Sequence, residues 1–277
     1  MSSPFVTTDW LAQHLSDANL VLVDASWYMP NAGRNPEEEY RAGHLPGAVF
    51  FDIDGIADHT TDLPHMLPSP AEFADAVGKL GISEDMTIVI YDEQGLFSAS
   101  RVWWTFRTFG AKDVRILEGG GAKWRAEKRH IEAGVTRRNP ATFNASFDPT
   151  AVANFDTVAA RSRDRAAQVL DARPAPRFNA EVPEPRPGLR SGHIPGSTNV
   201  PVGLVSEDGV LKSPEELRQL FAEKGVDLTR PIITSCGSGI TASTLALALH
   251  QAGASSVAVY DGSWSEWGAR PDAEVEA

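Results

Sequence analysis

The strongest constraint on the fold is that the chain repeats itself. Four stretches of the first half recur in the second half in the same order, at offsets between 143 and 149 residues. The matching pairs are YRAGHLPGAVFFDI (40–53) and LRSGHIPGSTNVPV (189–202), LVLVDAS (20–26) and AQVLDAR (167–173), TIVIYDEQGLFSAS (87–100) and PIITSCGSGITAS (231–243), and VRILEGGGAKW (114–124) and VAVYDGSWSEW (257–267). Single glycine motifs often match by chance, but four collinear pairs do not. The repeat therefore predicts two copies of one domain, which fits a length of 277 residues.

Within each copy, short Val- and Ile-rich stretches alternate with helical segments such as residues 214–224 and 242–251. This alternation predicts an α/β fold in which a mostly parallel sheet is flanked by helices. We predict an N-terminal domain over residues 1–135 and a C-terminal domain over residues 156–277. Residues 136–155 lie in a stretch rich in Thr, Asn, Ala and Pro, which indicates an extended linker packed across both domains.

The only cysteine of the chain, Cys236, lies in a glycine-rich loop between a predicted strand and a predicted helix. Ligands of open parallel sheets bind beyond the carboxyl ends of the strands, where this loop is expected. Gly237 and Gly239 allow successive backbone N–H groups to turn inward around an anion, and the helix start adds partial positive charge. Both effects favour a thiolate. The loop, completed by Ile240 and Thr241, predicts a nucleophilic cysteine.

The two copies differ at this loop. Aligned on Gly95 and Gly239, Asp92 takes the place of Cys236 and Gln94 that of Ser238, so the first copy has kept the fold and lost the nucleophile. One alternative is that Cys236 is a small core residue, as lone cysteines often are. Another is a cysteine phosphatase, but the arginine that such an enzyme needs six residues after its cysteine is replaced by Ala242.

Composition limits the kinds of molecule that we expect the protein to bind and the compartment in which we expect it. A net charge of −12 argues against nucleic acid or an anionic membrane surface as partner. A single cysteine excludes an internal disulfide and fits a reducing compartment. The N-terminus has no basic region followed by an apolar core, and no apolar run approaches the roughly 18 residues of a membrane span. We therefore expect a cytoplasmic protein without a membrane segment.

These features resemble the rhodanese superfamily of sulfurtransferases. The likeness covers essentially the whole chain and rests on the tandem domains, on GHLPG and GHIPG, on the cysteine loop, and on the endings YDGSWSEW and GARPD. The loop CGSGIT (236–241) is similar to that of the family members that use 3-mercaptopyruvate, whereas members that use thiosulfate carry basic residues where this chain has Gly237 and Ser238. The resemblance implies that Cys236 takes sulfur from 3-mercaptopyruvate as a persulfide.

The resemblance also implies residues that bind the substrate. Arg177 and Arg186 match the family's substrate-binding arginines, and a guanidinium group binds a carboxylate with two hydrogen bonds. The alternative is that both are surface arginines paired with Glu181 and Glu184. His44 and His193 could suggest a metal site, but they recur in both copies. We therefore expect them to support the fold by bonding to backbone or to Asp24 and Asp171, each of which ends a short predicted strand of its copy. No metal or organic cofactor is implied.

A proton relay is implied as well. The family pairs the residue at Ser238 with a histidine and an aspartate of the first domain, and His65 and Asp54 keep the family spacing. His59 and Asp52 are nearby competitors. The implied sulfur acceptors are a small thiol, thioredoxin or cyanide. Two other functions stay open, a thiosulfate:cyanide sulfurtransferase on the same fold and a sulfur-carrier module with little turnover of its own.

Overall fold

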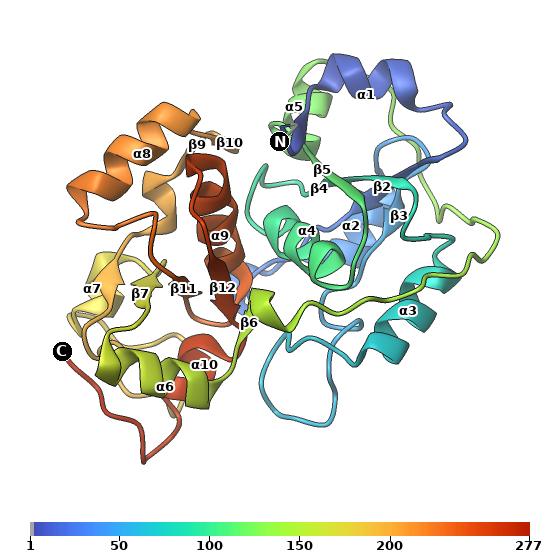
Figure 1. Ribbon diagram of the computed structural model, residues 1–277. Coiled ribbons are helices and arrows are strands. Elements are labelled where there is room, and N and C mark those ends of the chain that lie inside the picture. Colours follow the sequence, from blue (N-terminus) through green and yellow to red (C-terminus); the bar gives the residue numbers. More distant parts are fainter. Residues whose placement is uncertain (1–2) are drawn as a thin grey trace. The chain divides into compact units, whose positions relative to one another are not determined.

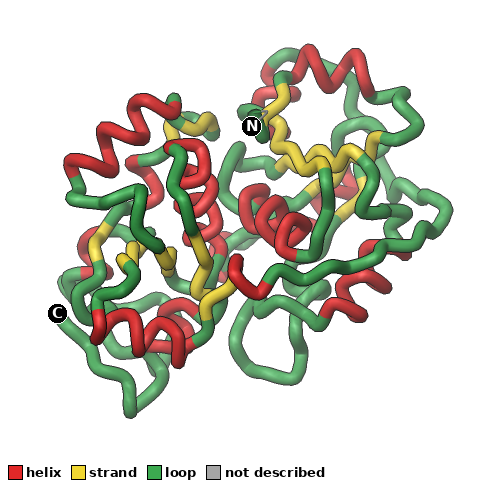
Figure 2. The backbone as a smooth tube through the Cα atoms, in the orientation of Figure 1, coloured by secondary structure: helices red, strands yellow, loops and turns green. Residues whose placement is uncertain are grey.

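A computed structural model describes residues 3–277, which form two compact units. Unit 1 comprises Met1–Asp58, Leu67–Asp148 and Asp208–Val210, of which residues 1 and 2 are not described. Unit 2 comprises His59–Met66, Pro149–Glu207 and Leu211–Ala277. Figures 1 and 2 show that each unit contains a sheet with helices packed on it.

Unit 1 has a sheet of five parallel strands in the order β1-β5-β4-β2-β3. The strands are β1 (Phe5–Val6), β2 (Leu20–Asp24), β3 (Val49–Phe50), β4 (Thr87–Tyr91) and β5 (Asp113–Leu117). The helices are α1 (Thr8–His14), α2 (Pro36–Ala42), α3 (Pro70–Lys79), α4 (Ala99–Thr108) and α5 (Gly120–Ala126), with a short 3-10 turn, η1 (Pro30–Ala32). Each strand is followed by a helix that returns the chain to the same end of the sheet, as parallel pairing requires.

Unit 2 repeats this order as β6-β12-β11-β7-β8, again with all strands parallel. Its strands are β6 (Val152–Ala153), β7 (Gln168–Asp171), β8 (Thr198–Asn199), β11 (Ile232–Ser235) and β12 (Val257–Tyr260). Its helices are α6 (Phe155–Asp164), α7 (Ala175–Phe178), α8 (Pro214–Glu223), α9 (Ile240–Ala252) and α10 (Ser263–Trp267), with the 3-10 turns η2 (Pro149–Ala151) and η3 (Val202–Leu204). The predicted α/β fold with two repeated domains is confirmed.

Helices cover both faces of each sheet, because alternate strand residues point to opposite faces. In unit 2, Val169 and Ile233 pack with residues of α6 and α10, including Trp264 and Trp267. In unit 1, Val89 packs on the face of α1 and α5. On the opposite faces, α4 contacts β4 and β5, and α9 contacts β11 and β12. Five tryptophans are buried in these cores: Trp103, Trp104, Trp124, Trp264 and Trp267.

The histidines shared by the two copies support the fold. The backbone N–H of His44 donates to Glu132 O (2.8 Å), and that of His193 donates to Glu276 O (2.7 Å), so each ties its copy's final segment to the domain. Their Nδ1 atoms lie 3.0 Å and 2.9 Å from the backbone oxygens of Glu132 and Phe178. The structure thus shows the predicted bonding to backbone.

One local feature is found in only one of the two copies, and another differs from the prediction made from the sequence. Only unit 2's half of the chain carries the two-stranded ribbon of β9 (Ser206–Glu207) and β10 (Val210–Leu211) among the described residues. Residues 136–148, predicted as linker, group with unit 1. Phe143 is buried there against Phe73 (ring centroids 5.3 Å apart), and Ala141 N–H donates to Gly78 O (2.9 Å). The domain limits at 135 and 156 stay a prediction.

No helix among residues 3–277 is long and apolar enough to cross a membrane.

Candidate active site

The cysteine loop connects the carboxyl end of β11 to the start of α9. Strand β11 ends at Ser235 and α9 begins at Ile240, so the connection is four residues long. Gly239 has φ 82°, the left-handed conformation that glycine adopts without strain, and it directs the chain into the helix. The N–H groups of Ile240, Thr241 and Ala242 are the first of α9 and have no acceptor within the helix. The loop is therefore built to receive an anion.

Helix α10 holds the loop from the other side. The N–H of Trp264 donates to the carbonyl of Cys236 (3.0 Å), and the Cys236 N–H donates to the Ser263 hydroxyl (3.1 Å). Ser265 donates to the carbonyl of Gly237 from both its N–H (2.9 Å) and its hydroxyl (2.7 Å). Ser263 is buried and has φ 47°, an uncommon conformation for serine. These bonds fix the backbone on both sides of the thiol.

Both predicted substrate-binding arginines lie beside the residue that follows the cysteine. A Cβ atom placed on Gly237 would lie 3.2 Å from Nη2 of Arg177 and 3.8 Å from Nη1 of Arg186. Glycine at this position therefore leaves room for two guanidinium groups next to the loop. Cys236 is 2% exposed and Ser238 5% exposed. Such burial also suits a core cysteine, but a core cysteine needs no pair of arginines beside it.

Arg177 is part of a buried chain of charges. Its Nη2 and Nε lie 2.5 Å and 3.1 Å from the two carboxylate oxygens of Glu184. Glu184 also pairs with Arg173 (2.9 Å), which pairs with Asp171 (2.7 Å) at the end of β7. Burial alone would lower the pKa of Arg173, but the two carboxylates hold that pKa above its usual value. Of the two suggested surface partners, Glu181 instead accepts a bond from Asn179 (3.0 Å).

The equivalent loop of unit 1 is closed by its own side chain. The Oδ2 atom of Asp92 accepts bonds from the N–H groups of Phe97, Ser98 and Ala99, each at 2.8 Å, and Oδ1 accepts from the N–H of Gln94 (2.8 Å). Asp92 is 1% exposed. The N–H groups of this loop thus converge on the side chain that stands where the second copy has Cys236.

The residues predicted for a proton relay are divided between the two units. His65 lies in the segment His59–Met66, which groups with unit 2, as Ser238 does. His65 is buried and has φ 61°, which is uncommon outside glycine. Asp54 belongs to unit 1, where its Oδ2 accepts a bond from Nε1 of Trp27 (2.8 Å). The relay of Ser238, His65 and Asp54 stays a prediction.

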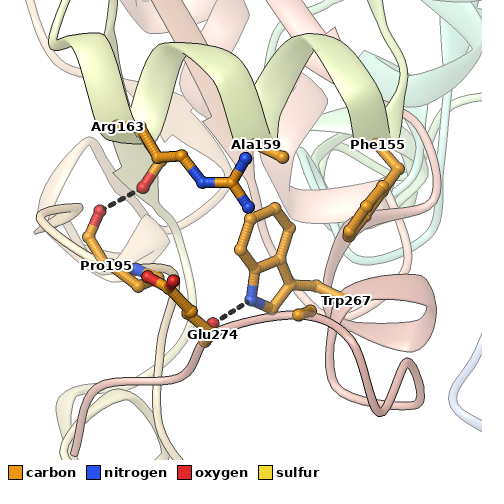
Figure 3. Close-up of a pocket in the computed structure, with 8 residues that line it drawn as sticks. Phe155, Ala159, Arg163, Pro195, Trp267 and Glu274 are labelled. Atoms are coloured by element: carbon orange, nitrogen blue, oxygen red, sulfur yellow. Dashed lines mark hydrogen bonds between the residues drawn. The ribbon is translucent and has the colours of Figure 1, made fainter.

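Two hollows lie apart from the cysteine loop. Figure 3 shows a small pocket of unit 2 in which the Trp267 ring lies beside Phe155 and donates to the carbonyl of Glu274 (2.8 Å). A larger cavity in unit 1, about 360 Å³, is lined by two ion pairs, Arg34 with Glu39 and Arg125 with Glu93. The described residues include no cluster of three or more His, Cys, Asp or Glu that could hold a metal ion.

Sequence reasoning missed several residues that build the site. Glu184 pairs with Arg177 and is itself paired with Arg173. Ser263 and Ser265 form hydrogen bonds with the loop backbone. The repeat carries a signal for the serines, since the first copy has Gly120 and Ala122 at their positions. Side chains that appear only in the copy with the cysteine are candidates for supporting it.

Comparison with known proteins agrees with this geometry. The rhodanese-like domain model matches the chain twice, over residues 7–127 and 154–270. The chain is 50% identical to the 3-mercaptopyruvate sulfurtransferase of Escherichia coli K12, covering 98% of this chain and 97% of that one. It is 42% identical to the mitochondrial thiosulfate/3-mercaptopyruvate sulfurtransferase 1 of Arabidopsis thaliana, covering all of this chain and 79% of that one.

Among solved structures, the crystal structure of the Escherichia coli 3-mercaptopyruvate sulfotransferase SseA superposes with a TM-score of 0.88 at 46% identity, covering 95% of this chain and 99% of that one. Two matched domains, identity of this level over nearly the whole length and a shared tandem fold leave one assignment. The chain belongs to the rhodanese family, among the tandem-domain sulfurtransferases of the 3-mercaptopyruvate type.

Proposed function

We propose that the protein transfers sulfur from 3-mercaptopyruvate to an acceptor through a persulfide on Cys236. The observation that carries this proposal is the occupied loop of unit 1. There, four backbone N–H groups bind the carboxylate of Asp92, at the place that the Cys236 side chain takes in unit 2. A loop that stabilises a carboxylate also stabilises a thiolate and a persulfide anion.

In the first step, the Cys236 thiolate attacks the thiol sulfur of 3-mercaptopyruvate. A sulfur–sulfur bond forms while the carbon–sulfur bond breaks, and its electron pair leaves with the carbon as the enolate of pyruvate. Proton uptake by the enolate carbon gives pyruvate. In the second step, an acceptor thiolate or cyanide attacks the outer sulfur and releases the Cys236 thiolate, which makes the reaction a two-stage, ping-pong sequence.

The arginines and the relay have separate tasks in this proposal. Arg177 and Arg186, beside Gly237, hold the carboxylate and keto oxygen of the substrate and stabilise the charge that develops on the enolate oxygen. Ser238, with His65 and Asp54, removes the proton of the substrate thiol and returns one to the enolate. Hydrogen bonds between α10 and the backbone of the loop keep the thiol in place while charge moves.

The partners and location belong to the same proposal. We propose a small thiol, thioredoxin or cyanide as acceptor, and a cytoplasmic location, since a chain with one cysteine forms no internal disulfide and suits a reducing compartment. A sulfur carrier without turnover of its own is a weaker alternative, because a carrier needs no pair of arginines beside its cysteine.

The test compares sulfur donors. We expect kcat/KM for 3-mercaptopyruvate to exceed that for thiosulfate by at least about tenfold, because the loop itself lacks the cations that a small dianion requires. A relative whose name includes thiosulfate makes the comparison necessary. Preference for thiosulfate would contradict the proposed donor while leaving the persulfide chemistry intact. Modification by a partner's persulfide but not by free 3-mercaptopyruvate would instead favour the carrier.

A further inference from the structure

Three charged side chains lie fully buried behind Arg177. Asp171, Arg173 and Glu184 have side chains that are each 1% exposed, whereas that of Arg177 is 20% exposed. Arg173 is fixed by Nε bonds to both oxygens of Asp171 (3.1 and 3.0 Å), by a bond to Gly192 O (2.8 Å), and by the Trp264 ring 4.2 Å below its guanidinium carbon. These contacts hold Arg173 in one position, and its ion pair with Glu184 (2.9 Å) therefore fixes the position of that carboxylate.

Glu184 passes this rigidity to Arg177. Its two oxygens meet Nη2 and Nε of Arg177 at 2.5 and 3.1 Å, an arrangement that fixes the plane of the guanidinium group as well as its position. An arginine side chain otherwise loses much rotamer freedom when it binds a ligand. With one edge held by Glu184, Arg177 is already oriented beside Gly237, where the sulfur donor must bind.

Glu184 also sets the charge of this group of side chains. Asp171 and Glu184 carry two negative charges and Arg173 and Arg177 two positive charges, so the four together are neutral. Without the charge of Glu184 the group would carry +1 next to the substrate. Such a change favours a dianion over a monoanion, because the energy of an ion in a field scales with its charge. At neutral pH, thiosulfate carries two charges and 3-mercaptopyruvate chiefly the one on its carboxylate.

We propose that Glu184 is a positioning and selectivity residue: it orients Arg177 and cancels one positive charge, so that the site prefers a monoanionic over a dianionic sulfur donor. This inference rests on the proposed function of Cys236 and its arginines. No direct contact between Glu184 and the substrate is required.

Two substitutions separate charge from geometry. Glu184→Gln keeps the size and one carbonyl acceptor but removes the charge, and should raise the ratio of kcat/KM for thiosulfate over 3-mercaptopyruvate by about tenfold. Glu184→Asp keeps the charge but shortens the reach, and should raise KM for 3-mercaptopyruvate about five- to tenfold while leaving kcat within about twofold. Because Arg177 lies beside the binding position of either donor, KM for thiosulfate should rise by the same factor, so that the donor ratio stays unchanged. The matched control is Glu215→Gln, which removes an exposed carboxylate on α8 and should change neither quantity.

An unchanged or lower donor ratio in a folded Glu184→Gln variant would overturn the selectivity role. A Glu184→Asp variant with unchanged KM would overturn the positioning role, and this variant decides the case if Glu184→Gln does not fold. The wild-type protein is incubated in parallel with 3-mercaptopyruvate and analysed by mass spectrometry. If Cys236 of the wild type gains sulfur but both Glu184 variants keep the wild-type kinetic parameters, only the role of Glu184 is refuted. If Cys236 gains no sulfur, the proposed function itself is refuted.

Discussion

The loop after β4 in unit 1 and the loop after β11 in unit 2 have the same place in two equivalent sheets, yet they are filled differently. In unit 1, Asp92 supplies its own anion to the loop, and Glu93 stands at the position of Gly237 and pairs with Arg125 (3.0 Å). In unit 2 the same two positions hold a thiol and a glycine, and two arginines approach from outside.

The difference shows how a duplicated domain divides its tasks. Both anion positions of the first copy are occupied by covalently attached carboxylates, which stabilises that copy and blocks it as a site. In the proposed mechanism, the loop of the second copy holds a sulfur atom and its two arginines bind the substrate. The backbone chemistry is common to both copies, and the side chains at two positions decide which copy reacts.

The largest expected effect concerns the nucleophile. Cys236→Ser should lower pyruvate release from 3-mercaptopyruvate by at least about 10⁴-fold, because a serine hydroxyl neither ionises at neutral pH nor accepts sulfur. Steady-state assay of pyruvate gives the value, with unfolding curves to show that the fold is kept. Pyruvate release close to that of wild type would remove the basis for contrasting the two loops.

The next effect is on stability, and it falls on the first copy. Asp92→Ala leaves four N–H groups of a buried loop without their acceptor and should lower the free energy of unfolding by about 3–5 kcal/mol. Urea unfolding followed by tryptophan fluorescence reports this, since five of the seven tryptophans lie in unit 1. The control Asp75→Ala removes an exposed carboxylate and should cost under about 0.5 kcal/mol. Equal costs for the two variants would contradict the role of Asp92.

The arginines come third. Arg186→Ala should lower kcat/KM for 3-mercaptopyruvate about 100-fold through loss of charge-assisted hydrogen bonds, and should affect thiosulfate less, because thiosulfate has no carboxylate to hold. Arg218→Ala, which removes an exposed arginine on α8, serves as control. An equal loss with both donors would show that Arg186 does not read the carboxylate.

The smallest effect uses the aspartates that end β2 and β7. Asp24 is bound by the Tyr91 hydroxyl (2.7 Å), and burial raises its pKa to about 6, against the opposing bonds from Ser26 and Tyr91. The folded state therefore binds this proton more tightly than the unfolded state, and stability falls as the pH rises from about 4 to about 6. The free energy of unfolding of Asp24→Asn should therefore exceed that of the wild type by about 2 kcal/mol at pH 7.5 and equal it at pH 4.

The counterpart in unit 2 should respond with the opposite sign. Asp171→Asn leaves the buried guanidinium of Arg173 short of a charge partner and should lower the free energy of unfolding at pH 7.5 by about 2–3 kcal/mol. Urea unfolding of both variants at both pH values provides the measurement. If both substitutions change the free energy of unfolding at pH 7.5 in the same direction, the different partners, Tyr91 and Arg173, do not distinguish the two positions.

Much of this architecture can be read from the sequence because it is repeated or strongly patterned. The alternation of apolar strands and helices predicts both sheets, and the predicted helix over 214–224 is observed as α8. The predicted helix over 242–251 begins two residues earlier, at Ile240, because Gly239 turns the chain directly into it. The collinear repeats predict the position of Cys236 and the exchange with Asp92.

Other features depend on contacts that no local pattern encodes. The segment that carries Arg177 and Arg186 is largely irregular, and Glu184 looks like a surface residue in the sequence although it is buried between two arginines. Family resemblance supplied both arginines, but it gave no reason to single out Arg173. Burial and pairing of charges distant from the loop become visible only in three dimensions.

The most direct measurement is the mass of the peptide that contains Cys236 after brief incubation with 3-mercaptopyruvate, with pyruvate quantified in the same sample. We expect this peptide to gain one sulfur atom, in an amount equal to the pyruvate released before any acceptor is added. Pyruvate release with no sulfur on Cys236, or sulfur that remains there when an acceptor thiol and cyanide are supplied, would contradict a transferable persulfide held in this loop.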